Sequence, residues 1–213
     1  FLDDRKGLSP LFRLGVQITV ASLMCYAGAQ FKLPVAWGEW TQSYWCYFPL
    51  TIAWYIGVIN AFNLIDGLDG LSSGLAIIAS IGMMGVMFFS GFNTSIIFPI
   101  TILVFIGSIL GFLRYNYNPA SIFLGDSGSL FIGFFLATTA LLLGRADAFL
   151  VTMGIPILCI GIPLIDTSLA ILRRSVRYIL YRKEGQTSGV MTADRNHMHH
   201  RLLNYARGNQ RRA

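Results

Sequence analysis

Long apolar runs constrain this chain more than any other feature, because they recur from one end of it to the other. A bilayer core about 30 Å thick requires roughly 20 apolar residues in helical form. We expect six membrane-crossing helices, over residues 14–31, 45–65, 71–90, 96–113, 130–143 and 149–172. The fifth run is short for a span, and the others have adequate length. The sequence therefore predicts an all-α, polytopic membrane bundle.

A soluble all-α core is the alternative interpretation. Soluble helices keep a polar face opposite their buried stripe. The runs in this chain mostly lack such a face, and the whole sequence is 54% hydrophobic and only 12% charged. Its mean hydropathy of +0.60 agrees with this pattern. The membrane interpretation is therefore the stronger one.

The distribution of basic residues predicts the orientation of the bundle. If the six runs cross alternately, 14 of the 16 Lys and Arg residues fall on one side, ten of them in the tail from Arg173 to Arg212. Only Lys32 and Arg145 fall opposite. The positive-inside rule makes the basic side cytoplasmic. Nucleic acid is a weaker explanation for the basic tail than anionic lipid headgroups, so we expect a membrane-lipid partner and no nucleic acid.

Most acidic residues are predicted to lie on the same, cytoplasmic side as the basic residues. Seven of the ten lie at the ends of apolar runs, namely Asp3, Asp4, Asp66, Asp69, Asp126, Asp166 and Asp194. Acids there are costly unless they are paired or bound to a metal, so they are functional candidates. An ion-coupled transporter would carry its acids within the segments, and a structural scaffold would have no use for them. We therefore expect one active site at the cytoplasmic face.

The first polar motif covers residues 60–71. Asn60, Asn63 and Asp66 recur every three residues, so on a helix they share a broad face at its cytoplasmic end. We expect them to line one cavity, with Gly67 and Gly70 letting the backbone turn and approach a ligand. The alternative is that residues 60–71 form only a helix end followed by a Gly-rich turn. That interpretation would leave the Asn amides unpaired in lipid, which is costly.

The second motif covers residues 116–129, and its central acid is Asp126, placed just before a new helix. Ser127 or Ser129 can cap that helix, and its free amides favour anions. A carboxylate and an amide oxygen at a helix mouth suit Mg²⁺, which keeps several waters and shares its ligand shell with substrate phosphates. Simple capping by Asp126 is the alternative.

The third motif holds all three histidines of the chain, within residues 194–201. Zinc is the competing interpretation, but no Cys lies nearby. Imidazoles interleaved with Arg195 and Arg201 are better suited to phosphate oxygens. We interpret this motif as an anion clamp, with a solvated basic loop as the alternative.

Together these motifs resemble the cytosolic motifs of the polyprenyl-phosphate N-acetylhexosamine-1-phosphate transferases, of glycosyltransferase 4 type. The resemblance rests on five stretches in the family's order, namely Asp3-Asp4, residues 60–71, residues 123–129, residues 165–174 and His197 to His200. It implies a Mg²⁺-dependent enzyme, with Mn²⁺ as a substitute. Such an enzyme transfers a HexNAc-1-phosphate from a UDP-sugar to undecaprenyl phosphate and releases UMP.

Within the family, the muramoyl-pentapeptide branch carries a Lys where this chain has Gly7 and an uninterrupted His run where this chain has His-Met-His-His. The resemblance therefore favours the GlcNAc-1-phosphate branch, which starts O-antigen, lipopolysaccharide or wall-polymer synthesis. It also implies a multi-pass protein of the bacterial inner membrane, with a homodimer as one possible assembly.

The resemblance further implies roles for individual residues. Asn63 and Asp126 are implied metal ligands. The implied catalytic acids are Asp3 and Asp4, which position or deprotonate the lipid phosphate, with Asp66, which acts through water, and Asp69. The implied substrate-binding residues are Asn60, Asn116, Phe123, Arg195, His197, His199 and His200. Asn116 and Phe123 correspond to contacts with uracil, and the Arg and His residues to the pyrophosphate clamp. Asp166 is expected to orient Arg173 or the loop rather than to perform chemistry.

We expect residues 1–213 to form a single transmembrane catalytic domain, with 173–213 as a cytoplasmic basic loop that carries the His cluster. Family members carry further transmembrane helices on both sides of this region. The chain is therefore expected to be an internal fragment of a longer protein.

Overall fold

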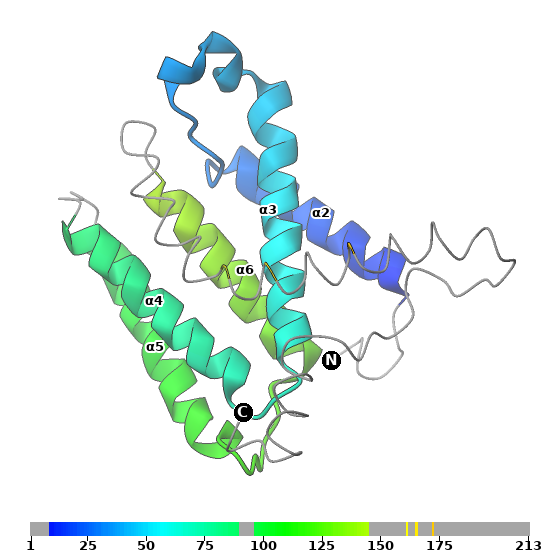
Figure 1. Cartoon of the computed structure of the whole chain (residues 1–213), viewed down its shortest axis with the longest axis vertical. Coiled ribbons are helices and arrows are strands. Elements are labelled where there is room, and N and C mark those ends of the chain that lie inside the picture. Colours follow the sequence, from blue (N-terminus) through cyan, green and yellow to red (C-terminus); the bar gives the residue numbers. More distant parts are fainter. Residues whose placement is uncertain (1–8, 90–95, 145–160, 162–164, 166–171, 173–213) are drawn as a thin grey trace, which may run out of the picture.

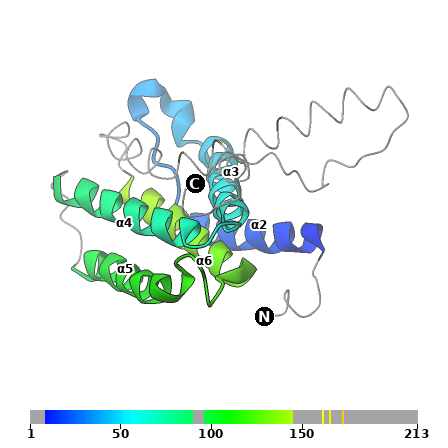
Figure 2. The ribbon, with the colours of Figure 1, turned by 60° about the horizontal axis from the view of Figure 1, so that its bottom comes forward.

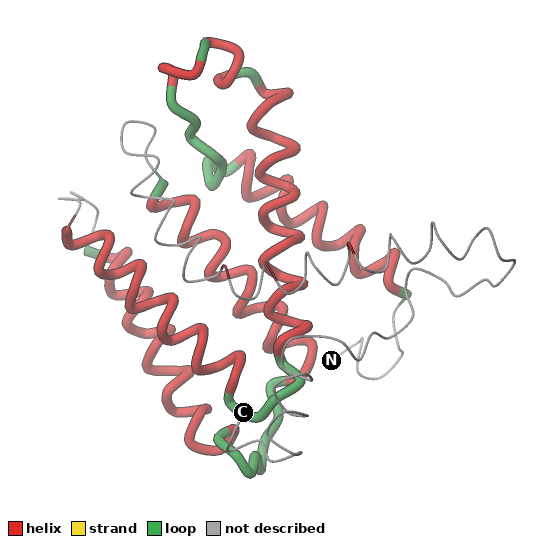
Figure 3. Tube along the Cα trace, in the orientation of Figure 1, coloured by secondary structure: helices red, strands yellow, loops and turns green. Residues whose placement is uncertain are grey.

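The structure is a computed structural model that describes residues 9–89, 96–144, 161, 165 and 172. In these residues it contains five α-helices, two short 3-10 helices and no strand (Figure 3). Four of the helices are long and apolar enough to cross a membrane, and a fifth apolar helix, Pro10–Tyr26, is shorter. The predicted all-α, multi-pass membrane architecture is confirmed.

The first helix, α2, spans Pro10–Tyr26, whereas the apolar run predicted 14–31. It begins earlier because Ser9 caps it, its Oγ accepting from the Phe12 backbone N–H at 3.3 Å, and because Pro10 is preset for a first helical turn. It ends before Gly28, whose φ is 95°.

After α2 the chain passes through two 3-10 helices, η1 (Val35–Trp37) and η2 (Glu39–Gln42), into α3 (Tyr44–Ile65). Aromatic side chains are exposed around the start of α3, including Trp40 and Trp45. Trp and Tyr favour the membrane–water interface, so this end of the bundle has the composition of an interfacial belt. The polar end of α3, at Asp66, is the opposite one.

Three further helices complete the described bundle: α4 (Leu71–Phe89), α5 (Ile97–Asn116) and α6 (Gly125–Leu143). The predictions for α4 and α5 were close, except that α5 continues three residues beyond the predicted end at residue 113. The prediction for α6 was wrong at its start, which lies five residues before residue 130. The sixth predicted segment, 149–172, lies outside the described residues except for its residues 161, 165 and 172.

The core of the bundle is the contact between α3 and α6, with α2 packed on α3 and the α4–α5 pair packed on α6 (Figures 1 and 2). Gly133 of α6 lies directly against α3, because a Cβ added there would be 2.7 Å from the Ile59 Cα. The indole of Trp54 donates to the Ala137 carbonyl at 3.2 Å. This close approach fixes the end of α3 relative to the start of α6, where the polar motifs lie.

The loops after α3 and after α5 lie at the same end of the bundle (Figure 1). The Gly70 backbone N–H donates to the Asn116 side chain at 3.1 Å, which links the loop after α3 to the end of α5. Gly70 has φ 74°, a left-handed conformation that glycine adopts freely. The expected alternation of crossings, which brings the first two motifs to one side, is therefore observed for α3 to α6.

Candidate active site

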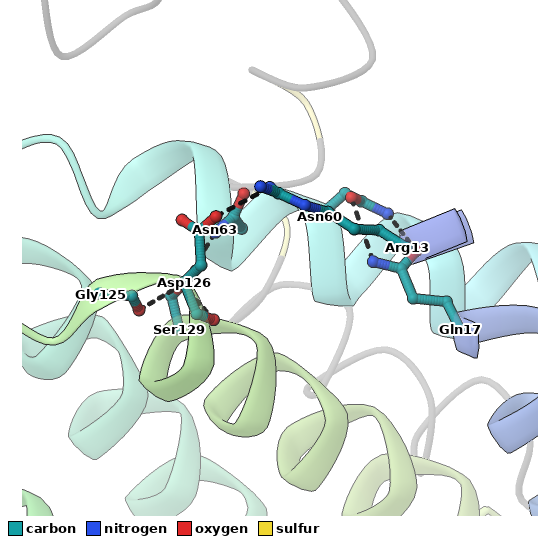
Figure 4. Close-up of polar contacts among 7 residues, drawn as sticks. All are labelled: Arg13, Gln17, Asn60, Asn63, Gly125, Asp126 and Ser129. Atoms are coloured by element: carbon teal, nitrogen blue, oxygen red, sulfur yellow. Dashed lines mark hydrogen bonds and ion pairs between the residues drawn. The ribbon is translucent and has the colours of Figure 1, made fainter. Parts of the chain in front are cut away.

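Asp126 is the centre of a polar cluster where α3 ends and α6 begins (Figure 4). Its Oδ2 accepts from Arg13 Nη1 of α2 at 2.8 Å. Its Oδ1 accepts from Asn63 Nδ2 of α3 at 3.1 Å. Three helices that are distant in sequence therefore converge on one carboxylate.

The carboxylate lies in the first turn of α6 rather than before the helix, which corrects the sequence prediction. The helix starts early because Gly125 has φ 67°, so the chain turns there and Asp126 enters helical geometry. A negative charge in the first turn is stabilised by the unpaired N–H groups and the helix dipole. The structure thus provides a fixed, favourably placed anion.

Ser129 does not cap α6, contrary to expectation, because no side chain caps this helix at its N-cap residue Leu124. The buried Ser129 Oγ instead accepts from Asn63 Nδ2 at 3.0 Å. Its own proton lies within reach of two carbonyl oxygens of the same turn, those of Gly125 at 3.1 Å and Asp126 at 3.2 Å. Ser129 therefore fixes the Asn63 amide.

Asp66 ends α3 and adds a second carboxyl group to this region. Burial, and next the negative charge of Asp126, raise the pKa of Asp66 to about 7. Two carboxyl groups that disfavour each other's charge are stabilised by a cation. This electrostatic situation is the one expected of a cation site.

The donor set fits a hard divalent cation with few protein ligands. Asp126, Asp66 and Asn63 offer oxygen atoms, which Mg²⁺ prefers. In the described part of the chain, no group of three or more His, Cys, Asp or Glu side chains could hold a metal ion. The Asn63 amide presents its nitrogen to Asp126, so a half-turn of the amide would be needed to offer Oδ1 to a cation.

The loop between α5 and α6 is fastened to the loop after α3 by a second polar cluster. Asp69 accepts from Asn118 Nδ2 at 3.0 Å and from the Ala120 backbone N–H at 3.1 Å. Asn116, only 4% exposed, accepts from the Gly70 backbone and from Ser73 Oγ, and donates to the Ile122 carbonyl at 3.0 Å. Both predicted site residues, Asp69 and Asn116, are thus engaged within the protein.

Phe123 lies between these two clusters in sequence and is 73% exposed. The loop around it is tied down by Asn116 and Asp69. A fixed backbone with an exposed aromatic ring offers a face for stacking.

Asn60 is turned away from the Asp126 cluster. Its amide forms a reciprocal pair with Gln17 of α2 and a bond to the Ile56 carbonyl (Figure 4). Asn60 and Asn63 therefore have their partners on different helices, α2 and α6, whereas the sequence predicted that both line one cavity with Asp66. The broad helical face that these residues share meets α2 on one side and α6 on the other.

The other predicted site residues lie outside the described residues. They are Asp3, Asp4, Arg195, His197, His199 and His200, together with Asp166 and Arg173. Their predicted roles remain predictions.

Sequence reasoning gave no role in these clusters to Arg13, Gln17, Ser73 and Asn118, and it gave Ser129 only a capping role. For the first two a signal existed. Arg13 and Gln17 are four residues apart at the start of an apolar helix, and residues at that spacing share one helical face. Polar groups on one face of an apolar helix indicate polar partners on a neighbouring helix.

Comparison with known proteins shows similarity to one family of transferases. Residues 1–144 match the sequence profile of glycosyl transferase family 4. A probable undecaprenyl-phosphate N-acetylglucosaminyl 1-phosphate transferase of Bacillus subtilis is 39% identical over 95% of this chain and 54% of its own length. A decaprenyl-phosphate N-acetylglucosaminephosphotransferase of Mycobacterium tuberculosis is 33% identical over 99% of this chain and 55% of its own length.

A phospho-N-acetylmuramoyl-pentapeptide-transferase of Chlamydia trachomatis is 42% identical, over 58% of this chain and 35% of its own length. The two relatives above match almost the whole chain, whereas this one matches little more than half. The chain spans about half the length of the curated relatives that it matches throughout.

Proposed function

Because the chain belongs to glycosyl transferase family 4, we propose that the whole protein transfers GlcNAc-1-phosphate from UDP-GlcNAc to undecaprenyl phosphate. The lipid phosphate attacks the sugar-bearing phosphorus, the bond to UMP breaks, and a lipid-linked pyrophosphoryl sugar results. The names of the two relatives that match throughout, both acting with N-acetylglucosamine, support the sugar. Such a product would begin the synthesis of a cell-surface polysaccharide or wall polymer.

The observation that carries this proposal is the Asp126 carboxylate, held by Arg13 and Asn63 at the end of the bundle where Asp66 also lies. Joining a phosphate to a diphosphate brings anions together, so the site must supply positive charge and alignment. Asp126 and Asn63, with Asp66 through water, would hold Mg²⁺ or Mn²⁺. When bound, that cation would neutralise the diphosphate and the departing UMP.

The remaining proposed roles are those that the resemblance to the family implies. Asp3 and Asp4 would position the lipid phosphate or accept its proton. Arg195 and the histidines His197, His199 and His200 would bind the pyrophosphate oxygens, which suit guanidinium and imidazolium donors. Asp69 and Asn116 would also hold in shape the loop between α5 and α6, which carries Phe123, in keeping with their observed bonds.

The protein is a multi-pass membrane protein. We further propose a location in the bacterial inner membrane with the site facing the cytoplasm, on the side where 14 of the 16 basic residues would lie if the six predicted segments cross alternately. Residues 1–213 would form a single catalytic domain, with 173–213 as its cytoplasmic basic loop.

The test is release of UMP by the whole protein in lipid nanodiscs. We expect UMP to appear only when UDP-GlcNAc, undecaprenyl phosphate and Mg²⁺ are all present, and its amount to equal that of the lipid-linked product. Release without the lipid would indicate a hydrolase instead. Absence of release with UDP-GlcNAc, but release with another UDP-N-acetylhexosamine, would correct the sugar and keep the reaction.

Replacing Phe123 with Ala should weaken binding of the uridine nucleotide by about tenfold, because stacking of an aromatic ring on a base contributes roughly 1–3 kcal/mol. The ring is 73% exposed on a fixed loop, so its removal leaves the fold intact. Calorimetric titration with UMP measures the effect. Ile122→Ala is the matched control, since the neighbouring Ile122 side chain is also exposed. Unchanged nucleotide affinity with a raised KM for the lipid would assign Phe123 to the acceptor groove.

A further inference from the structure

Gln17 of α2 and Asn60 of α3 form a reciprocal amide pair next to the Asp126 cluster (Figure 4). Asn60 Nδ2 donates to Gln17 Oε1 at 2.8 Å, and Gln17 Nε2 donates to Asn60 Oδ1 at 3.4 Å. Asn60 Nδ2 also donates to the Ile56 carbonyl at 2.8 Å, so both of its amide protons are used. This pair joins α2 to α3 and leaves Asn60 without a proton for a substrate.

The pair is a direct hydrogen-bonded contact between α2 and α3 near the site. The buried residues of α2 are Gln17, Ala21 and Cys25, one stripe with a spacing of four residues. Two of these side chains are small and remove little apolar surface from lipid or water. Shape alone therefore fixes the position of α2 along α3 weakly, whereas a hydrogen-bonded polar pair, here with Gln17 buried and Asn60 half-buried, can specify register between helices.

The same two helices carry the next polar contact. Arg13 lies one turn before Gln17 on α2, and Asn63 lies one turn after Asn60 on α3. Arg13 and Asn63 both bond to Asp126. The Gln17–Asn60 pair and the Asp126 contacts are thus two successive links, and the first limits where the second can form.

We propose that Gln17 is a positioning residue, which through Asn60 fixes α2 in the register that holds the Arg13 guanidinium at Asp126. This proposal rests on the proposed function, in which positive charge at this place assists a reaction between anions. Gln17 itself touches no substrate. Its loss allows α2 to slide or rotate, and the guanidinium then leaves the site.

The first experiment tests the link without reference to activity. Thermal unfolding of the whole protein in nanodiscs is compared for Gln17→Met, Asn60→Leu and the double variant. Each single substitution leaves a polar partner unsatisfied, the buried Gln17 in one variant and the half-buried Asn60 in the other, and should lower the Tm. The Tm of the double variant should be no lower than that of the less stable single variant, because neither helix then keeps a polar side chain that has lost its partner. If the Tm decreases of the two single variants add in the double variant, the proposed link between Gln17 and Asn60 is wrong. Thr19→Val is the control, since Thr19 is exposed and its Oγ1 donates within α2, to the Gly15 carbonyl.

The second experiment tests the positioning role through a kinetic cycle of Gln17→Met, Arg13→Met and both together. We expect Gln17→Met to lower kcat/KM for UDP-GlcNAc by about tenfold and to leave the KM for undecaprenyl phosphate unchanged. Arg13→Met should lower kcat/KM for UDP-GlcNAc at least as much. Adding Gln17→Met to Arg13→Met should lower this kcat/KM no further. Thr19→Val should retain wild-type values.

The outcomes are separable. If UMP is released and the effects of Gln17→Met and Arg13→Met multiply, Gln17 has a structural role only and the positioning proposal is wrong while the function stands. If the wild-type protein releases no UMP, the proposed function is wrong, and the stability cycle alone decides whether Gln17 and Asn60 form the link.

Discussion

The Asp126→Asn variant of the whole protein is expected to lose at least about 10²-fold in turnover, since it replaces a charged group at the centre of the site with a neutral one. Asp126 accepts from Arg13 and from Asn63 through different oxygens, so an amide at this position would turn a donor toward one of them. The substitution therefore removes the anion and disturbs both of its neighbours. Initial rates of UMP release at saturating Mg²⁺ measure the effect.

Glu39→Gln is the matched control for this prediction, because Glu39 is an exposed acid in η2, at the opposite end of α3. Its rate should equal that of the wild type. The Tm of Asp126→Asn should be measured in parallel, so that loss of fold is separated from loss of chemistry. Wild-type turnover in Asp126→Asn would remove Asp126 from the metal ligands and leave Asn63 and Asp66 as the remaining described candidates.

Replacing Gly133 with Ala should lower turnover on the order of 10²-fold, although Gly133 lies two helical turns from Asp126. The added Cβ would meet the Ile59 Cα at 2.7 Å and the Val58 carbonyl oxygen at 3.0 Å, both backbone atoms that cannot turn aside. The helices α3 and α6 must then separate, at a cost of about 1–3 kcal/mol in unfolding free energy. A displacement of about 1 Å between catalytic groups is enough for a rate loss of this size.

The control for the glycine substitution is a Gly→Ala change at a position where the added Cβ would not clash. Gly107 of α5 has no atom within 4 Å of an added Cβ. We expect Gly107→Ala to keep the wild-type rate and to stabilise its helix slightly, since Ala is the better helix former. If Gly133→Ala has the same Tm and turnover as Gly107→Ala, the close contact between α3 and α6 does not determine the geometry of the site.

The apolar runs predicted where the described helices lie, but not where three of them begin or end. A run of apolar residues reports the part of a helix that faces lipid, whereas hydrogen bonding continues through polar residues beyond it. The helix α2 therefore includes Arg13, α5 includes Asn116, and α6 includes Asp126. At α6 this difference changes the chemistry, because Asp126 moves from a preceding loop into a helical turn.

The partners of the polar residues could not be predicted from spacing. Periodicity correctly placed Asn60 and Asn63 on one face of α3, but it does not say which helices that face meets. Asn60 pairs with Gln17, 43 residues away, and Asn63 pairs with Asp126, 63 residues away. Only the packing of α2 and α6 on opposite sides of this face separates the two roles.

The separation of α3 from α6 along the chain has a consequence for biogenesis. The α4–α5 pair is synthesised between them, and Asn63 meets Asp126 only when 63 further residues have been made. At about 5–20 residues per second, translation leaves an interval of roughly 3–12 s between the two. During that interval α3 is present in the membrane with its end lacking the partner that α6 supplies. Until α6 is inserted, the Asn63 amide must be hydrogen-bonded by the insertion machinery or by a neighbouring lipid headgroup, so the contacts around Asp126 form only after α6 has been synthesised.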